Sequence, residues 1–174
     1  MNKVFVARLS FQILVAATIA AVLSGANAQG PEPAGIAASD LALVAKVHAE
    51  GAQIYECKMD ARGERAWQFR EPIATLLVDG KTIGRHFAGP RWELMDGSAV
   101  GAEVVARAPG ATPNDIPLLK LKVTAQAKTG RLGEVTAVQR LNTSGGVLEG
   151  TCSSPGELKS VPYSADYTFL QPAH

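Results

Sequence analysis

The chain has 174 residues, of which 47% are hydrophobic and 19% are charged, and its formal net charge is +1. This length suits one domain after removal of a short N-terminal segment. A near-neutral chain without a run of Lys and Arg has no electrostatic footprint for nucleic acid or anionic lipid, so we expect neither as a partner. A small molecule or another protein is the expected partner.

Residues 1–28 are typical of a secretory signal peptide. Lys3 and Arg8 give a positive start, an apolar run follows, and Ala26-Asn27-Ala28 places small residues at the positions that a signal peptidase reads. The apolar run is short and wrongly flanked for a stable membrane span, so an N-terminal anchor is the less favoured alternative. We predict cleavage after residue 28, no membrane span in the mature chain, and export to the periplasm or the extracellular medium.

The mature chain is expected to begin with a flexible leader and to contain one disulfide. Residues 29–39 are rich in Pro, Gly and Ala and predict the leader, and residues 40–174 predict a single β domain. Cys57 and Cys152 are the two cysteines of the chain. In an oxidising compartment they have one intramolecular pairing, which stabilises the fold by on the order of 4 kcal/mol in the chain-entropy picture. Two free thiols are the alternative.

The first part of the mature chain shows apolar alternation, which is typical of strands. Residues 41–47 and 53–57 predict two strands joined by a turn at Ala49-Glu50-Gly51. Residues 67–70 predict a third strand. Pro72 is expected to mark a bend or an edge, because proline cannot donate a hydrogen bond to a neighbouring strand.

Two Asp-Gly dipeptides, Asp79-Gly80 and Asp96-Gly97, predict hairpins, because a type I′ turn needs positive φ at its central positions. Further strands are predicted at residues 74–78, 82–88, 92–95, 98–107, 119–127, 135–141 and 163–169. The mature chain shows no sustained helical period. We therefore predict an all-β fold: a single small antiparallel barrel or sandwich of about eight to nine strands with tight hairpins.

Five co-linear segments carry a resemblance to a known family. They are Gly51–Cys57, Trp67–Pro72, Gly84–Glu93, Gln139–Gly146 and Val161–Tyr167. In this order they resemble the domain-of-unknown-function family numbered thirty-four fifty-five, found in bacteria and fungi. The resemblance runs over nearly the whole mature chain. It implies an exported domain, and it brings no activity, cofactor or site residue with it.

The candidate binding residues gather around one predicted hairpin. On the strand, His86 shares a face with small neighbours, whereas Ile83 and Phe87 are expected in the core. His86 would then lie on a surface with room for a ligand, where an imidazole, a carboxylate and an indole can bind a small polar molecule or a sugar. The candidates are Trp67, Glu71, His86, Trp92 and Glu93. The alternative is that both tryptophans pack in the core and His86 makes a structural hydrogen bond.

Other chemistries have weaker signals. The histidines of the mature chain have no paired spacing and both cysteines are engaged, so we expect no metal and no cofactor. The leading hypothesis is a non-enzymatic exported domain that binds a small molecule or a partner through the surface from His86 to Glu93. One alternative is a small secreted enzyme that acts on a carbohydrate or similar polar substrate, with Glu71, His86 or Glu93 as acid–base groups. A purely structural envelope protein is the other.

Overall fold

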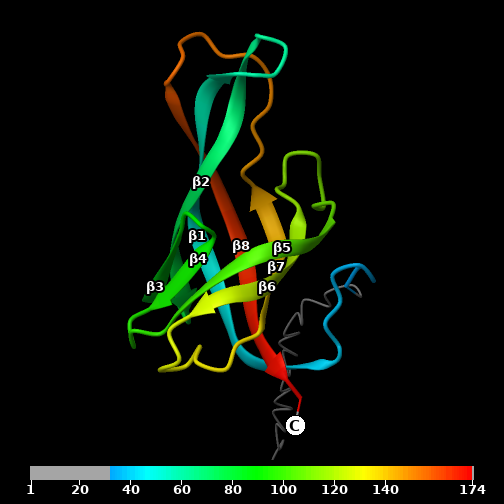
Figure 1. The fold of residues 1–174 in the computed structure, drawn as a ribbon, viewed down its shortest axis with the longest axis vertical. Helices are drawn as coiled ribbons and strands as arrows, with labels where there is room; N and C mark the ends of the chain where they lie inside the picture. Colours follow the sequence, from blue (N-terminus) through cyan, green and yellow to red (C-terminus); the bar gives the residue numbers. More distant parts are fainter. Residues whose placement is uncertain (1–31, 174) are drawn as a thin grey trace, which may run out of the picture. The chain divides into compact units, whose positions relative to one another are not determined.

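The computed structural model describes residues 32–173, and the predicted signal peptide lies outside the described residues. The strands are β1 (Leu41–Met59), β2 (Arg65–Val78), β3 (Lys81–Phe87), β4 (Arg91–Leu94), β5 (Ala99–Ala108), β6 (Leu118–Gln126), β7 (Ala137–Gly145) and β8 (Leu158–Pro172). Each strand pairs antiparallel with the next, and β8 pairs with β1 to close a barrel (Figure 1). The all-β prediction is confirmed, and the architecture is a barrel. No helix within residues 32–173 is long and apolar enough to cross a membrane.

β1 is one long strand where the sequence predicted two. It pairs with β8 from Leu41 to Glu56 and with β2 from His48 to Met59. The predicted turn at residues 49–51 is therefore wrong. Position 51 is glycine because the neighbouring strand comes very close there. A Cβ at this position would lie 2.0 Å from the Ile73 carbonyl oxygen. Glycine inside a strand can mark such a close backbone approach as well as a turn, and here it permits the approach.

β2 is also continuous, and it runs straight through Pro72. It pairs with β1 along its length, but with β3 only from Ala74 to Val78. Pro72 therefore lies where β2 has no β3 neighbour on its other side, and the predicted edge at this residue is confirmed. Because β4 has only four residues, the barrel wall is shortest on the β3–β4 side.

Both predicted Asp-Gly hairpins are present, and their turns differ. Asp79 and Gly80 have φ values of 49° and 71°, as a type I′ turn requires. In the second hairpin Gly97 has a φ of 81°, whereas Asp96 does not have a positive φ. The Gly97 amide donates to the Leu94 carbonyl and the Leu94 amide donates to the Ser98 carbonyl. This is a three-residue loop with a type I turn and a glycine bulge, so the type I′ prediction holds only for the first hairpin.

The barrel interior is filled by alternate residues of the strands. On β8, Tyr163, Ala165, Tyr167 and Phe169 are all buried, as their alternation along the sequence predicts. The Trp92 ring lies edge-on to the Tyr167 ring, with centroids 5.2 Å apart. Burial of each large apolar side chain stabilises the fold by about 1.5–3 kcal/mol, so this aromatic group is a main source of barrel stability.

Residues 32–39 belong to the predicted flexible leader, and they lie against the outside of the barrel. Ile36 is fully buried. The side-chain amide of Gln139 donates to the Ile36 carbonyl oxygen at 2.7 Å and to the Glu32 carboxylate at 2.8 Å. The Lys120 ammonium donates to the Ala37 carbonyl oxygen at 2.8 Å. This segment therefore covers part of β6 and β7.

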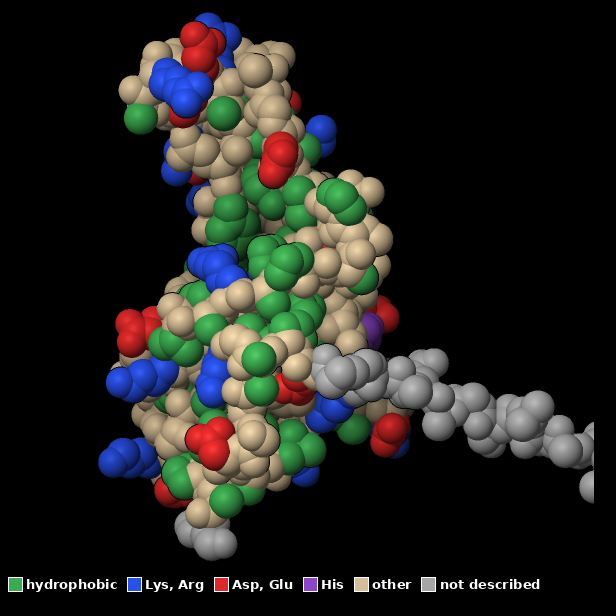
Figure 2. Space-filling model, turned by 90° about the vertical axis from the view of Figure 1, so that its right-hand side faces the viewer, with side chains coloured by type: hydrophobic (Ala, Val, Ile, Leu, Met, Phe, Trp, Pro, Cys, Tyr) green, Lys and Arg blue, Asp and Glu red, His purple; other side chains and the backbone are tan. Residues whose placement is uncertain are grey.

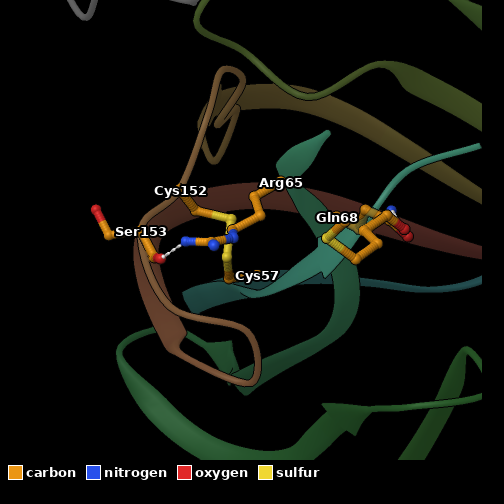
Figure 3. The surroundings of a disulfide bond; sticks show 6 residues. Cys57, Arg65, Gln68, Cys152 and Ser153 are labelled. Carbon is orange, nitrogen blue, oxygen red and sulfur yellow. Dashed lines mark hydrogen bonds between the residues drawn. A yellow bond between two sulfur atoms is a disulfide. The ribbon is translucent and has the colours of Figure 1, made fainter. Parts of the chain in front are cut away.

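The far end of the β1–β2 hairpin forms a tip together with the loop before β8, at the top of Figure 1. We define the tip as residues 56–68 and 146–157. The disulfide Cys57–Cys152 joins these two parts, with the Cα atoms 5.7 Å apart, so the predicted pairing is confirmed. The Arg65 guanidinium donates to the Ser153 carbonyl oxygen beside the disulfide (Figure 3). The Trp67 amide donates to the Gly150 carbonyl oxygen at 3.1 Å.

Candidate functional site

His86 faces the barrel interior, and its predicted place on the surface is wrong. Its side chain is only 2% exposed, and its cross-strand partners Ala74 and Trp92 are also buried. The small neighbour on the same face, Gly84, is required by packing, since a Cβ there would lie 2.3 Å from the Glu93 carbonyl oxygen. The small residue beside His86 on this face therefore indicates tight packing inside the barrel, and not an open surface.

His86 stacks on Trp92 inside the barrel. Their ring centroids are 4.6 Å apart with an interplanar angle of 6°, and the Tyr167 ring lies 5.0 Å from His86. Nδ1 of His86 is 2.8 Å from the Arg91 carbonyl oxygen, which can only accept, so Nδ1 carries the hydrogen. Burial lowers the pKa of His86 to about 4, against the opposing effect of this hydrogen bond. At neutral pH the imidazole is therefore uncharged, and Nε2 is left as an acceptor.

The two candidate glutamates lie apart from this pair. Glu93 forms an ion pair with Arg85, with 2.9 Å between the carboxylate oxygen and Nη2. Glu71 forms an ion pair with its neighbour Arg70 at 3.1 Å. Neither glutamate lines the cavity described below. The structure thus does not bring Glu71, His86 and Glu93 together as the acid–base hypothesis requires.

Trp67 lies in the tip. It is half-buried and pairs across β1 and β2 with Cys57, next to the disulfide. The Lys159 ammonium lies 5.6 Å from the centre of its indole ring, within the range of a cation–π contact. Trp67 has no part in the cavity lining. Of the five candidate residues, the structure therefore brings together only His86 and Trp92.

A cavity of about 340 Å³ opens beside the stacked His86 and Trp92. This volume is at the lower end of the range for small-molecule pockets. The lining includes aromatic, aliphatic and proline side chains, namely Tyr55, Phe69, Pro72, Pro90, Trp92, Val104, Ile116, Pro117, Leu119, Leu121 and Tyr167. On the face drawn in Figure 2, hydrophobic side chains gather in a hollow at mid-height of the molecule. The cavity is thus mostly apolar.

The cavity lies where the barrel wall is shortest. Phe69 and Pro72 line it from the part of β2 that has no β3 neighbour. On the opposite sides, Gly89 and Pro90 come from the β3–β4 turn and Ile116 from the loop before β6. Tyr55 connects this region to the tip, because its hydroxyl donates to the Gly146 carbonyl oxygen at 2.7 Å. The short β3 and β4 therefore leave a gap, and side chains from all eight strands surround it.

Arg140 is one of the charged residues of this lining. It is half-buried on β7, directly across from Tyr167 on β8. Its Nε donates to the Pro117 carbonyl oxygen at 3.0 Å. Arg140 forms no ion pair with any residue in the described range 32–173. Arg70 and Arg107 also line the cavity, and no Asp or Glu within residues 32–173 does.

Several buried polar atoms around the cavity have no hydrogen-bond partner among the described residues. They include Gln53 Nε2, Trp92 Nε1 and the Tyr167 hydroxyl, all on residues of the lining. Burial raises the pKa of Tyr167, and the Arg140 charge offsets part of this effect, so the hydroxyl keeps its proton. Each of these atoms can donate a hydrogen bond. A ligand in the cavity can therefore accept hydrogen bonds from the lining.

Sequence reasoning did not select Arg140 or Tyr167. Tyr167 follows the alternation of Tyr163 and Phe169, and that pattern predicted a strand without indicating a binding residue. Arg140 is in phase with the buried Val138 on the same strand. A charged residue on the inward face of a predicted strand was the available signal for Arg140.

The family described as "Protein of unknown function (DUF3455)" matches residues 37–171, which is nearly the whole barrel and tip. Neither the comparison with curated proteins nor the comparison with solved structures finds a significant match. The description of the family contains no activity. The chemistry of the cavity is therefore the basis for a functional conclusion.

Proposed function

The chain belongs to this family of unknown function, and we propose that its barrel is a binding domain for a small, largely apolar molecule. The observation that carries this proposal is the cavity of about 340 Å³ with its aromatic and aliphatic lining. The proposed binding site therefore lies in the barrel interior and not on an outer surface around His86. His86 and Trp92 remain the candidate contacts, and Glu71, Glu93 and Trp67 do not take part.

The lining is suited to such a ligand. Transfer of apolar ligand surface from water to this cavity is favourable by about 25 cal/mol per Å². The stacked rings of His86 and Trp92 are held by the Arg91 carbonyl and by Tyr167, so they need not reorganise on binding. A preformed site loses less conformational entropy when the ligand enters, and this increases affinity.

We further propose that the domain works outside the cytoplasm, with residues 1–28 as its signal peptide. The disulfide Cys57–Cys152 supports this location, because structural disulfides persist in oxidising compartments. The test is the intact mass of protein secreted from a host that expresses the full chain. A mature chain that begins at Gln29 is the expected result, and a full-length chain retained with the cells would contradict export.

The binding proposal is tested with the neutral fluorescent probe N-phenyl-1-naphthylamine and two neighbouring valines. Val104 lines the cavity, whereas Val105 is 54% exposed on the other face of β5. The wild-type protein should enhance the fluorescence of the probe. Val104→Trp should fill the cavity and abolish the enhancement, and Val105→Trp should keep it. Circular dichroism checks that both variants are folded, and the smaller Val104→Phe is used if Val104→Trp is not.

Two results would contradict the proposal. One is the absence of any enhancement with the wild-type protein. The other is a folded Val104→Trp or Val104→Phe variant that binds the probe as well as Val105→Trp does, since the probe would then bind outside the cavity.

A further inference from the structure

We propose that the ligand is an apolar organic acid whose single carboxylate binds the guanidinium of Arg140. This inference rests on the proposed function, because it names the chemical class of the molecule that the cavity takes. It follows from the charges of the lining, from the hydrogen bonds of Arg140 and from the state of His86.

The charges of the lining point to an anion. Among the residues that the structure describes, three arginines and no acidic residue line the cavity. Arg70 is neutralised by Glu71 at 3.1 Å and by Glu56 at 3.8 Å. Arg140 has no such partner within residues 32–173, although it is half-buried among apolar side chains. A cation withdrawn from water is costly unless an opposite charge accompanies it, and a bound carboxylate would supply that charge.

The hydrogen bonds of Arg140 leave its charged end available. Nε is engaged with the Pro117 carbonyl oxygen, which holds the side chain in place. No carboxylate within residues 32–173 pairs with Nη1 or Nη2, and the neutral Tyr167 hydroxyl lies close enough to interact with the guanidinium. The planar guanidinium can donate two parallel hydrogen bonds to a carboxylate, and such charge-assisted pairs are among the strong hydrogen bonds of proteins. The guanidinium is thus positioned for a carboxylate.

His86 limits the number of charges that the ligand carries. Burial keeps its imidazole neutral at pH 7, with Nδ1 donating to Arg91 and with Nε2 as an acceptor. A second anionic group placed beside His86 would meet this lone pair, which repels it, and no charge on His86 would compensate for its lost hydration. A monoanion with an apolar body satisfies both parts of the lining. Arg107, exposed at the edge of the cavity, adds positive potential that attracts such an acid from solution.

The test compares octanoate with octanamide, which have the same apolar body and differ in charge. Both compete with N-phenyl-1-naphthylamine, and calorimetry measures the affinities directly. With the wild-type protein, octanoate should bind about tenfold more tightly or better than octanamide. Arg140→Gln should remove this preference. Arg140→Lys, which keeps the charge and loses the planar fork, should keep only part of the preference.

The control is Arg62→Gln, which removes the same charge from an exposed residue in the β1–β2 turn and should leave the preference intact. If the probe binds but the wild-type protein does not prefer octanoate, or the preference survives Arg140→Gln, this inference is wrong and the cavity proposal stands. If neither the probe nor either octanoyl compound binds, both proposals are wrong. Should Arg140→Gln fail to fold, the wild-type preference and its reduction in Arg140→Lys still decide the matter.

Discussion

The barrel and the tip are built from the same two strands, and they are held together in different ways. In the barrel, Val47 on β1 and Leu76 on β2 are buried, with β8 and β3 as further neighbours. Towards the tip, β2 has no β3 neighbour, and Phe69 and Met59 are more than half exposed. There the disulfide joins β1 to the loop before β8. One region is stabilised by apolar burial, and the other depends on a covalent link.

The cavity lies at the boundary between these two regions. Its inner lining, including Trp92 and Tyr167, belongs to the packed barrel, and its outer lining, including Tyr55 and Phe69, leads to the tip. Neither the apolar core nor the disulfide occupies the space at this boundary. The core is densely packed inside the barrel, and the disulfide lies further out in the tip. A ligand can therefore enter a site at this boundary without separation of the paired barrel strands.

The largest expected effect is on the barrel, from Trp92→Ala. Trp92 is 1% exposed, and its removal should lower the free energy of unfolding by about 3–5 kcal/mol. Trp67→Ala, in the half-buried environment of the tip, should cost much less. Urea denaturation of both variants measures the difference. Equal losses would show that the tip depends on burial as much as the barrel does.

The second effect is on the tip, from removal of the disulfide. The double variant Cys57→Ser with Cys152→Ser should lower the free energy of unfolding by about 2–4 kcal/mol. If this variant is folded, the backbone amides at position 57 and at Trp67 should exchange faster with deuterium, because they bond only within the tip. The Leu94 amide, bonded within the β4–β5 hairpin, should stay protected. An equal loss of protection at Leu94 would mean that barrel and tip open together.

The third effect is a pH dependence of stability that arises in the barrel, from the buried His86, and not in the tip. Burial lowers the pKa of His86 to about 4, below its ordinary value of 6.5, so between these values the unfolded chain binds a proton that the folded chain does not. The free energy of unfolding is full above about pH 6.5 and should fall by up to about 3 kcal/mol as the pH drops to about 4. His86→Gln should remove this part of the pH dependence.

The matched control for this experiment is His48→Gln, since His48 is partly exposed on the outside of the barrel beside Asp166. Denaturation curves between pH 4 and pH 7 are compared for the three proteins. His48→Gln should keep the fall in stability that His86→Gln loses. A wild-type curve that is identical to that of His86→Gln would contradict the lowered pKa of His86.

Several features of the fold could be predicted from the sequence because they depend on local chemistry. The period-2 alternation of residues 163–169 predicted β8. Asp79-Gly80 predicted the β2–β3 hairpin, because the turn needs residues that adopt a positive φ. Pro72 predicted an edge because it has no N–H to donate. The pairing of Cys57 with Cys152 followed from their number in an expected oxidising compartment.

Other features were decided only by contacts between distant residues. Gly51 permits a close approach to Ile73 and does not make a turn, which depends on how β1 and β2 are paired. The side of β3 that faces inward depends on its pairing with β2 and β4, which places His86 opposite the buried Ala74 and Trp92.

The amino-acid sequence by itself determined an all-β domain with its hairpins, its edge at Pro72 and its disulfide. Strand alternation and turn dipeptides depend on neighbouring residues in a short segment. The disulfide could be predicted because two cysteines allow one intramolecular pairing, whatever the sequence separation between them. Only the tertiary structure decided that these strands close into a barrel and that His86, Trp92 and Arg140 share a cavity. These residues come from β3, β4 and β7, and Arg140 reaches the cavity because β7 pairs with β8 beside Tyr167. Strand register is a property of the paired sheet, and no single strand contains that information.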